Sequence, residues 1–118
     1  MTDTFETPPS IDRVSIHVLP RQALLDWLNT LPFGGEDTRL EELRENGVVY
    51  LVPFSDEEAE VIIEWHFERI FERELYAWCP DAEHHPEDQS WEAFHRMFDV
   101  RVDYMVFDLD GEALEVEE

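Results

Sequence analysis

The sequence contains no lysine, and eight arginines are its only permanently charged basic residues. Against them stand 30 aspartates and glutamates, so the formal charge at neutral pH is −22. A chain this acidic repels phosphate, which disfavours direct binding to DNA, RNA or an anionic membrane surface. An acidic surface without lysine is typical of adaptation to high salt. The alternative is a specific use of the acids, such as mimicry of a nucleic acid in the groove of a DNA-binding protein.

Cysteine and long apolar runs are equally scarce. The single cysteine cannot form an internal disulfide. No apolar run approaches the ~20 residues of a membrane-spanning helix. The N-terminus lacks the basic start and apolar stretch of a signal peptide. Because 43% of the residues are hydrophobic and 13% aromatic, the chain nevertheless has enough apolar surface to fold. We therefore expect a folded, cytoplasmic protein.

The residue pattern divides the chain into a flexible leader (1–12), a single α+β domain (13–110) and an acidic tail (111–118). Alternating or continuous apolar residues predict strands at 14–19, 48–54 and 100–107. Helical spacing and capping residues predict helices, counted with their caps, at 21–31, 38–46, 55–78 and 90–99. In the third helix, Ser55 is the expected N-cap, and Thr38 is the expected N-cap of the second.

The resulting order is β-α-α-β-α-α-β. Helical connections between all strands indicate a mixed or parallel three-stranded sheet. The segment 48–54 is apolar on both faces, which is typical of a central strand. We expect two layers, with the helices covering one face of the sheet.

The other face of the sheet is predicted to be partly polar, because Ser15, His17, Arg101 and Asp103 occupy one face of their strands. The same face would also carry apolar side chains, namely Leu19, some of the group around Val49 and Leu51, and either Met105 or Phe107. A second subunit could cover this apolar strip. The sequence therefore suggests a homodimer.

The densest group of chemically active side chains lies in the loop after the long helix. It holds Cys79, His84 and His85, with Trp78 and Trp91 on either side. Zinc sites usually have ligands in pairs such as C-x₂-C or H-x₃₋₅-H, whereas adjacent histidines point in different directions. We interpret the segment as a solvated loop with Cys79 half-buried, and a metal-dependent hydrolase using residues 78–91 stays the alternative.

Two more histidines complete the candidate binding cleft. His66 lies at the border of the apolar stripe of the long helix, and His95 lies on the last helix. A histidine beside an apolar stripe is usually a packing residue, and no nucleophile is placed beside either one. The sequence has neither a phosphate-binding loop nor a G-x-S-x-G motif, so it predicts no cofactor and no catalytic residue.

The long helix also carries a row of like charges at i, i+4 spacing. Arg69 and Arg73 are the only basic residues near this row and would partly relieve it. The row consists of Glu60, Glu64, Glu68 and Glu72. We expect it to face water.

Several short segments resemble a family of small, acidic bacterial proteins that has no assigned activity. They are Asp26-Trp27-Leu28, Leu40-Glu41-Glu42-Leu43-Arg44, Tyr50-Leu51-Val52-Pro53, Ile70-Phe71-Glu72 with Trp78, Trp91 with Phe94, and Val106-Phe107-Asp108-Leu109. The resemblance covers most of residues 14–110 and implies a stand-alone bacterial protein without transferable catalytic residues. In this family a second Trp stands where this chain has Cys79, which favours a packing role for that position.

These observations favour a non-enzymatic protein-interaction module with an acidic, salt-adapted surface. Its partner would be a protein, including a second copy of the chain. Two alternatives remain open at this point: the metal-dependent hydrolase and the nucleic-acid mimic.

Overall fold

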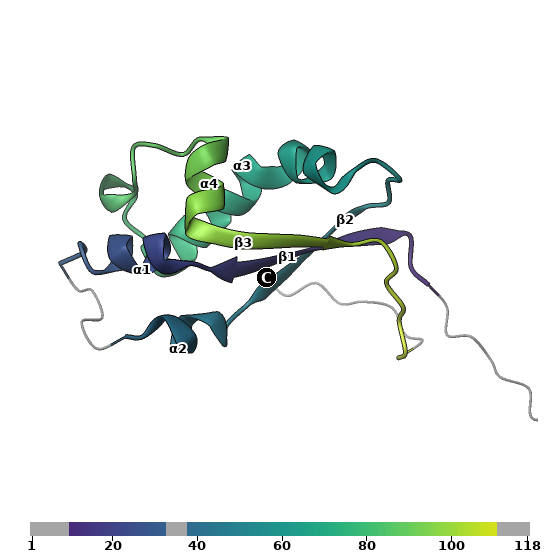
Figure 1. Cartoon of the computed structure of the whole chain (residues 1–118), viewed down its shortest axis with the longest axis horizontal. Helices are drawn as coiled ribbons and strands as arrows, with labels where there is room; N and C mark the ends of the chain where they lie inside the picture. Colours follow the sequence, from purple (N-terminus) through teal and green to yellow (C-terminus); the bar gives the residue numbers. More distant parts are fainter. Residues whose placement is uncertain (1–9, 33–37, 111–118) are drawn as a thin grey trace, which may run out of the picture.

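The computed structural model describes residues 10–32 and 38–110 (Figure 1). Its elements are β1 (Arg13–Pro20), α1 (Gln22–Leu28), α2 (Leu40–Arg44), β2 (Val48–Pro53), α3 (Ala59–Trp78), the 3₁₀ turn η1 (Ala82–His84), α4 (Trp91–Met97) and β3 (Phe98–Asp103). This confirms the α+β class and the predicted order of elements. Most of the predicted leader and all of the predicted tail lie outside the described residues. In the described part of the chain, no helix is long and apolar enough to cross a membrane.

The prediction of a mixed or parallel sheet is wrong, because all three strands pair antiparallel in the order β2-β1-β3. The predicted central strand is also wrong. β1 occupies the centre, whereas β2, which is apolar on both faces, lies at an edge. β2 is therefore apolar on both faces although it has a neighbouring strand on one side only.

The route of the connections explains the antiparallel pairing. β1 ends at Pro20, and β2 starts at the same end of the sheet, where Val48 faces Val18. The helices α1 and α2 thus return the chain to the end that it left. The next connection crosses the length of the sheet through α3, whose 20 residues extend about 30 Å. β2 and β3 consequently run in the same direction, but β1 separates them.

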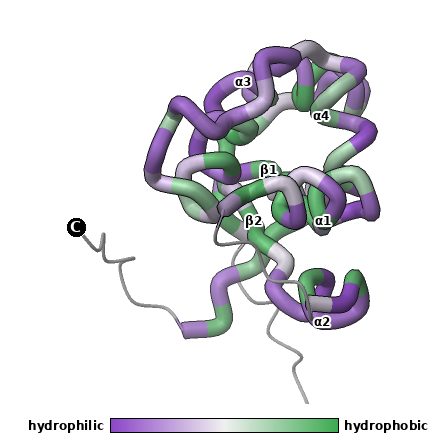
Figure 2. Tube along the Cα trace, turned by 90° about the vertical axis from the view of Figure 1, so that its left-hand side faces the viewer, coloured by the Kyte–Doolittle hydropathy of each residue, from purple (hydrophilic) through white to green (hydrophobic). Residues whose placement is uncertain are grey.

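Helices α3 and α4 lie on one side of the sheet, with α1 at its end (Figures 1 and 2). Helix α2 departs from the expectation that all helices cover one face, since it lies on the other side (Figure 2). Its position follows from contacts at the Pro20 end of β1. Arg44 of α2 donates to the carbonyl of Pro20 at 2.9 Å, and a Cβ on Gly47 would lie 2.6 Å from the side chain of Leu19. The rest of that face is left open by the described elements.

The core fills the space between the sheet and the pair α3 and α4. Val14, Ile16 and Val18 of the central strand are completely or almost completely buried. They meet a cluster of aromatic rings in which Phe71, Phe94 and Phe98 have centroids 5.4 to 6.0 Å apart. The alternation of β1 therefore places one entire side of this strand in the core.

The capping predictions had mixed outcomes. Ser90 caps α4 as expected, accepting the backbone N–H of Ala93 at 3.2 Å. Ser55 does not cap α3: it accepts the N–H of Glu57, and the helix begins only at Ala59. Thr38 is not the N-cap of α2, because that position is held by Arg39.

The strand predicted at 100–107 starts earlier, since α4 ends at Met97 and β3 begins at the next residue.

Candidate functional site

The open face of the sheet is formed by the residues of each strand that point away from α3 and α4. The register aligns Ser15 with Leu51 and Asp103, and His17 with Val49 and Arg101. Two grooves run along this face and share His17 and Val49. The second groove extends onto the segment after β3, lined by residues 104–107. We call this continuous surface the open sheet face.

Large apolar side chains are exposed along the open sheet face. Val49 is 53% exposed and Leu51 45%. In the segment after β3, Met105 is 74% exposed and Phe107 41%. Single exposed apolar residues are common, but a contiguous strip of them marks an interaction surface. The structure thus places on one face the apolar residues that the sequence suggested for a second subunit.

The open sheet face is also much less acidic than the chain as a whole. Strand β2 has no charged residue. The strand residues of this face carry two arginines, Arg13 and Arg101, and two aspartates, Asp99 and Asp103, so their charges cancel. In a chain with a net charge of −22, an electrically neutral apolar strip is a local exception. A partner could approach this strip without meeting a concentration of like charge.

A polar cluster lies in the middle of the open sheet face. The imidazole Nε2 of His17 lies 2.9 Å from Oδ2 of Asp103, and Nη2 of Arg101 lies 3.0 Å from the same oxygen. The hydroxyl of Ser15 lies 3.1 Å from Nε2 of His17 and 3.3 Å from the carbonyl oxygen of Asp103, to which it donates. These contacts join the central strand to β3.

The combination of serine, histidine and aspartate in this cluster does not form a catalytic triad. In a triad the acid holds one imidazole nitrogen and the serine hydroxyl contacts the other. Here both the carboxylate and the hydroxyl lie against Nε2 of His17. The side chain of Ser15 is buried and its hydroxyl donates to a backbone carbonyl. The cluster therefore satisfies polar groups on the sheet and does not activate a nucleophile.

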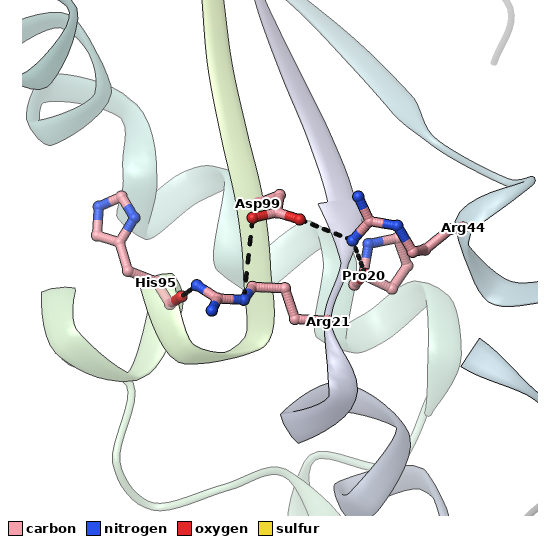
Figure 3. Close-up of polar contacts among 5 residues, drawn as sticks. All are labelled: Pro20, Arg21, Arg44, His95 and Asp99. Atoms are coloured by element: carbon pink, nitrogen blue, oxygen red, sulfur yellow. Dashed lines mark hydrogen bonds and ion pairs between the residues drawn. The ribbon is translucent and has the colours of Figure 1, made fainter. Parts of the chain in front are cut away.

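One end of the open sheet face is held by an aspartate between two arginines (Figure 3). Asp99 lies 2.7 Å from Nη1 of Arg44 in α2 and 3.9 Å from Nε of Arg21 at the start of α1. Arg21 also donates to the carbonyl of His95 at 2.7 Å. These contacts link α2, the end of β1 and the junction of α4 with β3. They fix α2 as the boundary of the open sheet face.

The cysteine and histidine loop makes structural contacts. Cys79 is completely buried, not half-buried as predicted, and its thiol donates to the carbonyl of Asp81 at 3.3 Å. The ring of His85 contacts the carbonyl of Cys79 at 2.7 Å and packs edgewise on Tyr76. His84 uses its backbone carbonyl to accept the indole N–H of Trp27 at 3.0 Å. Both adjacent histidines thus contact Trp27, His84 through its carbonyl and His85 through its ring.

The remaining residues of the predicted cleft lie in two places. His95 and Trp91 pack on each other with ring centroids 4.2 Å apart, and Trp91 also contacts Phe67. Burial lowers the pKa of His95; the charge of Glu60 opposes this effect, and the charge of Arg21 adds a smaller lowering. Trp78, the last residue of α3, is half-buried at the edge of the core.

His66 lies elsewhere, in a groove between β2 and α3. Its pKa is lowered by burial and by the nearby charge of Arg69. The seven predicted residues are therefore divided between the loop, α4 and this groove. Over residues 10–32 and 38–110, no three histidine, cysteine, aspartate or glutamate side chains are close enough together to hold a metal ion.

Sequence reasoning missed a buried carboxylate beside β2. Glu74 is only 4% exposed and accepts a hydrogen bond from the phenol of Tyr50. Nη1 of Arg73 lies 3.1 Å from the same carboxylate oxygen. Burial, and then the hydrogen bond to Glu74, raises the pKa of Tyr50 well above its usual range. A signal was available, because Glu74 stands between Phe71 and Leu75 on the apolar stripe of α3 and not in the exposed glutamate row.

Comparison of the chain with protein-family models, curated proteins and solved structures found no match of any of the three kinds. The resemblance to small acidic bacterial proteins is accordingly left as an expectation.

Proposed function

We propose that the protein is a cytoplasmic, non-enzymatic interaction module that binds a second copy of itself through the open sheet face. The observation that carries this proposal is the exposed apolar strip around Val49 on a sheet face that the described elements leave uncovered. The resemblance to small acidic bacterial proteins belongs to the same proposal and adds no residue role to it.

The composition of β2 supports the proposal. An edge strand with one solvated face normally alternates apolar and polar residues. β2 instead carries Val49 and Leu51 on its open side, more than two-fifths exposed in the monomer. A second apolar layer over the sheet would give these residues the burial that their side chains favour.

Charge favours a second copy over an oppositely charged partner. The open sheet face is neutral, whereas a strongly basic partner would be attracted to the acidic surfaces elsewhere. In a two-fold symmetric contact, each residue meets its equivalent set on the other copy, so Arg101 can approach Asp99 or Asp103 of its counterpart. A face with equal numbers of both signs is suited to pairing with itself.

The size of the face indicates which parts must take part. The sheet measures about 26 Å along β1 and about 14 Å across its three strands, or roughly 370 Å² in plan. Stable interfaces bury ~800 Å² on each partner. The contact must therefore include the neighbouring segment with Met105 and Phe107.

The distribution of acidic residues supports salt adaptation over nucleic-acid mimicry. A mimic would concentrate its carboxylates along one face at phosphate-like spacing. Exposed acids instead occur on α2, on α3, in the loop after α3 and on α4; they include Glu41, Glu42, Glu64, Glu68, Glu72, Asp81, Glu83, Asp88 and Glu92. Such a surface surrounds the molecule and leaves the open sheet face as the exception.

The test is the mass of the protein in solution, measured by size-exclusion chromatography with light scattering at low and at high salt. We expect a dimer that strengthens with salt, because screening weakens the repulsion between two copies of charge −22. Val49→Arg should abolish the dimer by placing an unpaired charge in its centre.

Trp65→Arg is the matched control for this experiment. Trp65 is 59% exposed on α3, outside the open sheet face, and the substitution adds the same charge. The control should remain dimeric. A wild-type protein that stays monomeric at every salt concentration would contradict the proposal, as would a dimer that both variants weaken equally.

A further inference from the structure

The groove that contains His66 lies between the outer edge of β2 and α3, behind the open sheet face. It is lined by Tyr50, Leu51, Val52, His66, Arg69, Ile70 and Arg73. Its volume is about 310 Å³, which is at the lower end of the range for small-molecule sites. Among the described strands only β1 pairs with β2, so the outer edge of β2 forms an open wall of the groove.

The groove gathers positive charge in a strongly acidic molecule. Arg69 and Arg73 are two of only eight arginines in the chain. We expected both to relieve the glutamate row of α3, but the structure pairs Arg73 with the buried Glu74 instead. Within the described residues, Arg69 makes neither a hydrogen bond nor an ion pair. Among the described contacts, this distinguishes Arg69 from Arg73, whose guanidinium is paired with Glu74.

The charges that line the groove sum to a single positive charge. Arg69 and Arg73 each contribute one, and the carboxylate of Glu74 cancels one of them. His66 is uncharged at neutral pH because its pKa is lowered, and the phenol of Tyr50 stays protonated because its pKa is raised. One positive charge matches one carboxylate better than it matches a doubly charged phosphate.

We propose that this groove binds a small carboxylic acid with an apolar body. The carboxylate would lie against the guanidinium of Arg69, with Arg73 beside it, as a charge-assisted hydrogen-bonded pair. The apolar body would lie on Leu51, Val52 and Ile70, which form the hydrophobic part of the lining. The charged part of this site is separate from the proposed dimer, because Arg69 and Arg73 belong to α3, whereas Leu51 lies at the border with the open sheet face.

The experiment is a titration of the ¹⁵N-labelled protein with octanoate, followed by amide chemical shifts. We expect saturable shifts confined to residues 50–52 and 66–73. Octan-1-ol has the same apolar chain without the charge and should bind at least about tenfold more weakly, since it forms no charge-assisted bond. Inorganic phosphate, which has no apolar body, should not compete at equal concentration.

Two variants with the same change in charge locate the site. Arg69→Gln should weaken octanoate binding at least about tenfold and leave the binding of octan-1-ol unchanged. Arg39→Gln is the matched control, because Arg39 is exposed next to α2 and does not line the groove. Both variants should keep the wild-type amide spectrum away from the substituted residue, which shows that they fold.

Four results would overturn the proposal. They are the absence of saturable shifts with octanoate, equal affinity for octanoate and octan-1-ol, competition by phosphate, and equal weakening by Arg69→Gln and Arg39→Gln. The dimer has a separate test, which is the mass of the protein in solution.

Discussion

The two faces of the sheet are built from the same three strands but have opposite surroundings. On one face, Val14, Ile16 and Val18 are buried against α3 and α4. On the other face, Val49 and Leu51 are as apolar as the core residues but remain about half exposed. The comparison shows that apolar side chains in a strand do not by themselves identify the covered face. An apolar residue can equally mark the face that a partner covers.

The largest expected difference between the two faces is the cost of shortening a side chain. Ile16→Ala should lower the free energy of unfolding by about 2–5 kcal/mol, because it leaves a cavity in the core. Val49→Ala, measured at concentrations that favour the monomer, should change it by no more than about 0.5 kcal/mol. Urea denaturation of both variants provides the measurement. Equal losses would show that the open face is covered within the monomer.

The second prediction concerns the polar group on the covered side of β2. Tyr50→Phe should cost about 1–2 kcal/mol, because the buried carboxylate of Glu74 loses a hydrogen-bond donor. The pKa of Tyr50 is raised in the folded protein, so this residue stabilises the fold fully below its unfolded pKa of about 10. Its contribution is lost as the pH rises above that value.

Denaturant unfolding at pH 8 to 11 tests this effect. The free energy of unfolding of the wild type should fall at the alkaline end, and Tyr50→Phe should fall less steeply. Parallel curves for the two proteins would show that the phenol is not held in its protonated form by Glu74.

The third prediction concerns the cap of α4, one of the two helices that cover the sheet. Ser90→Ala should cost about 1 kcal/mol, since the N–H of Ala93 loses its cap at the start of α4. Ser55→Ala is the comparison, because Ser55 caps no helix and the change should stay within about 0.5 kcal/mol. Thermal unfolding monitored by circular dichroism distinguishes them. A larger loss for Ser55→Ala would mean that α3 depends on the turn before it.

The smallest effect is expected in the polar cluster of the open sheet face. Asp103→Asn removes the charge next to His17 and Arg101. The side chain of Asp103 is 44% exposed, so solvent screens these pairs and the change should be less than about 0.5 kcal/mol. Urea unfolding in the monomeric range measures it. A loss of several kcal/mol would mean that the cluster is essential for the fold of β3.

Several features that a single segment determines were predicted correctly, although the caps expected at Ser55 and Thr38 were not. The alternation of β1, the long apolar stripe of α3 and the cap at Ser90 were all visible in the residues that form them. The open sheet face was predicted for the same reason, since alternation places Ser15 and His17 on one side of a strand. Local pattern was sufficient for each of these features.

Sheet topology and the position of most site residues depend on contacts between distant segments. Strand direction follows from where α1 and α2 return the chain, and no residue in either helix encodes that end point on its own. The predicted cleft failed to form as one site because His66 faces β2, while His85 turns toward Tyr76 and Cys79. The position of Glu74 on the apolar stripe of α3 signalled its burial, but its partner, Tyr50, lies 24 residues away and could not be identified locally.

The central position of β1 has a consequence for how the chain acquires its structure. β1 is synthesised before β3 and cannot complete its pairing until β3 is present, since Ser15 and Asp103 meet across 88 residues. Joining ends so far apart carries a large loop-closure entropy, and topologies dominated by distant contacts fold slowly. During synthesis, α3 can form its local hydrogen bonds while β1 still lacks one neighbour. The three-stranded sheet is therefore completed only after β3, up to Asp103, has been made.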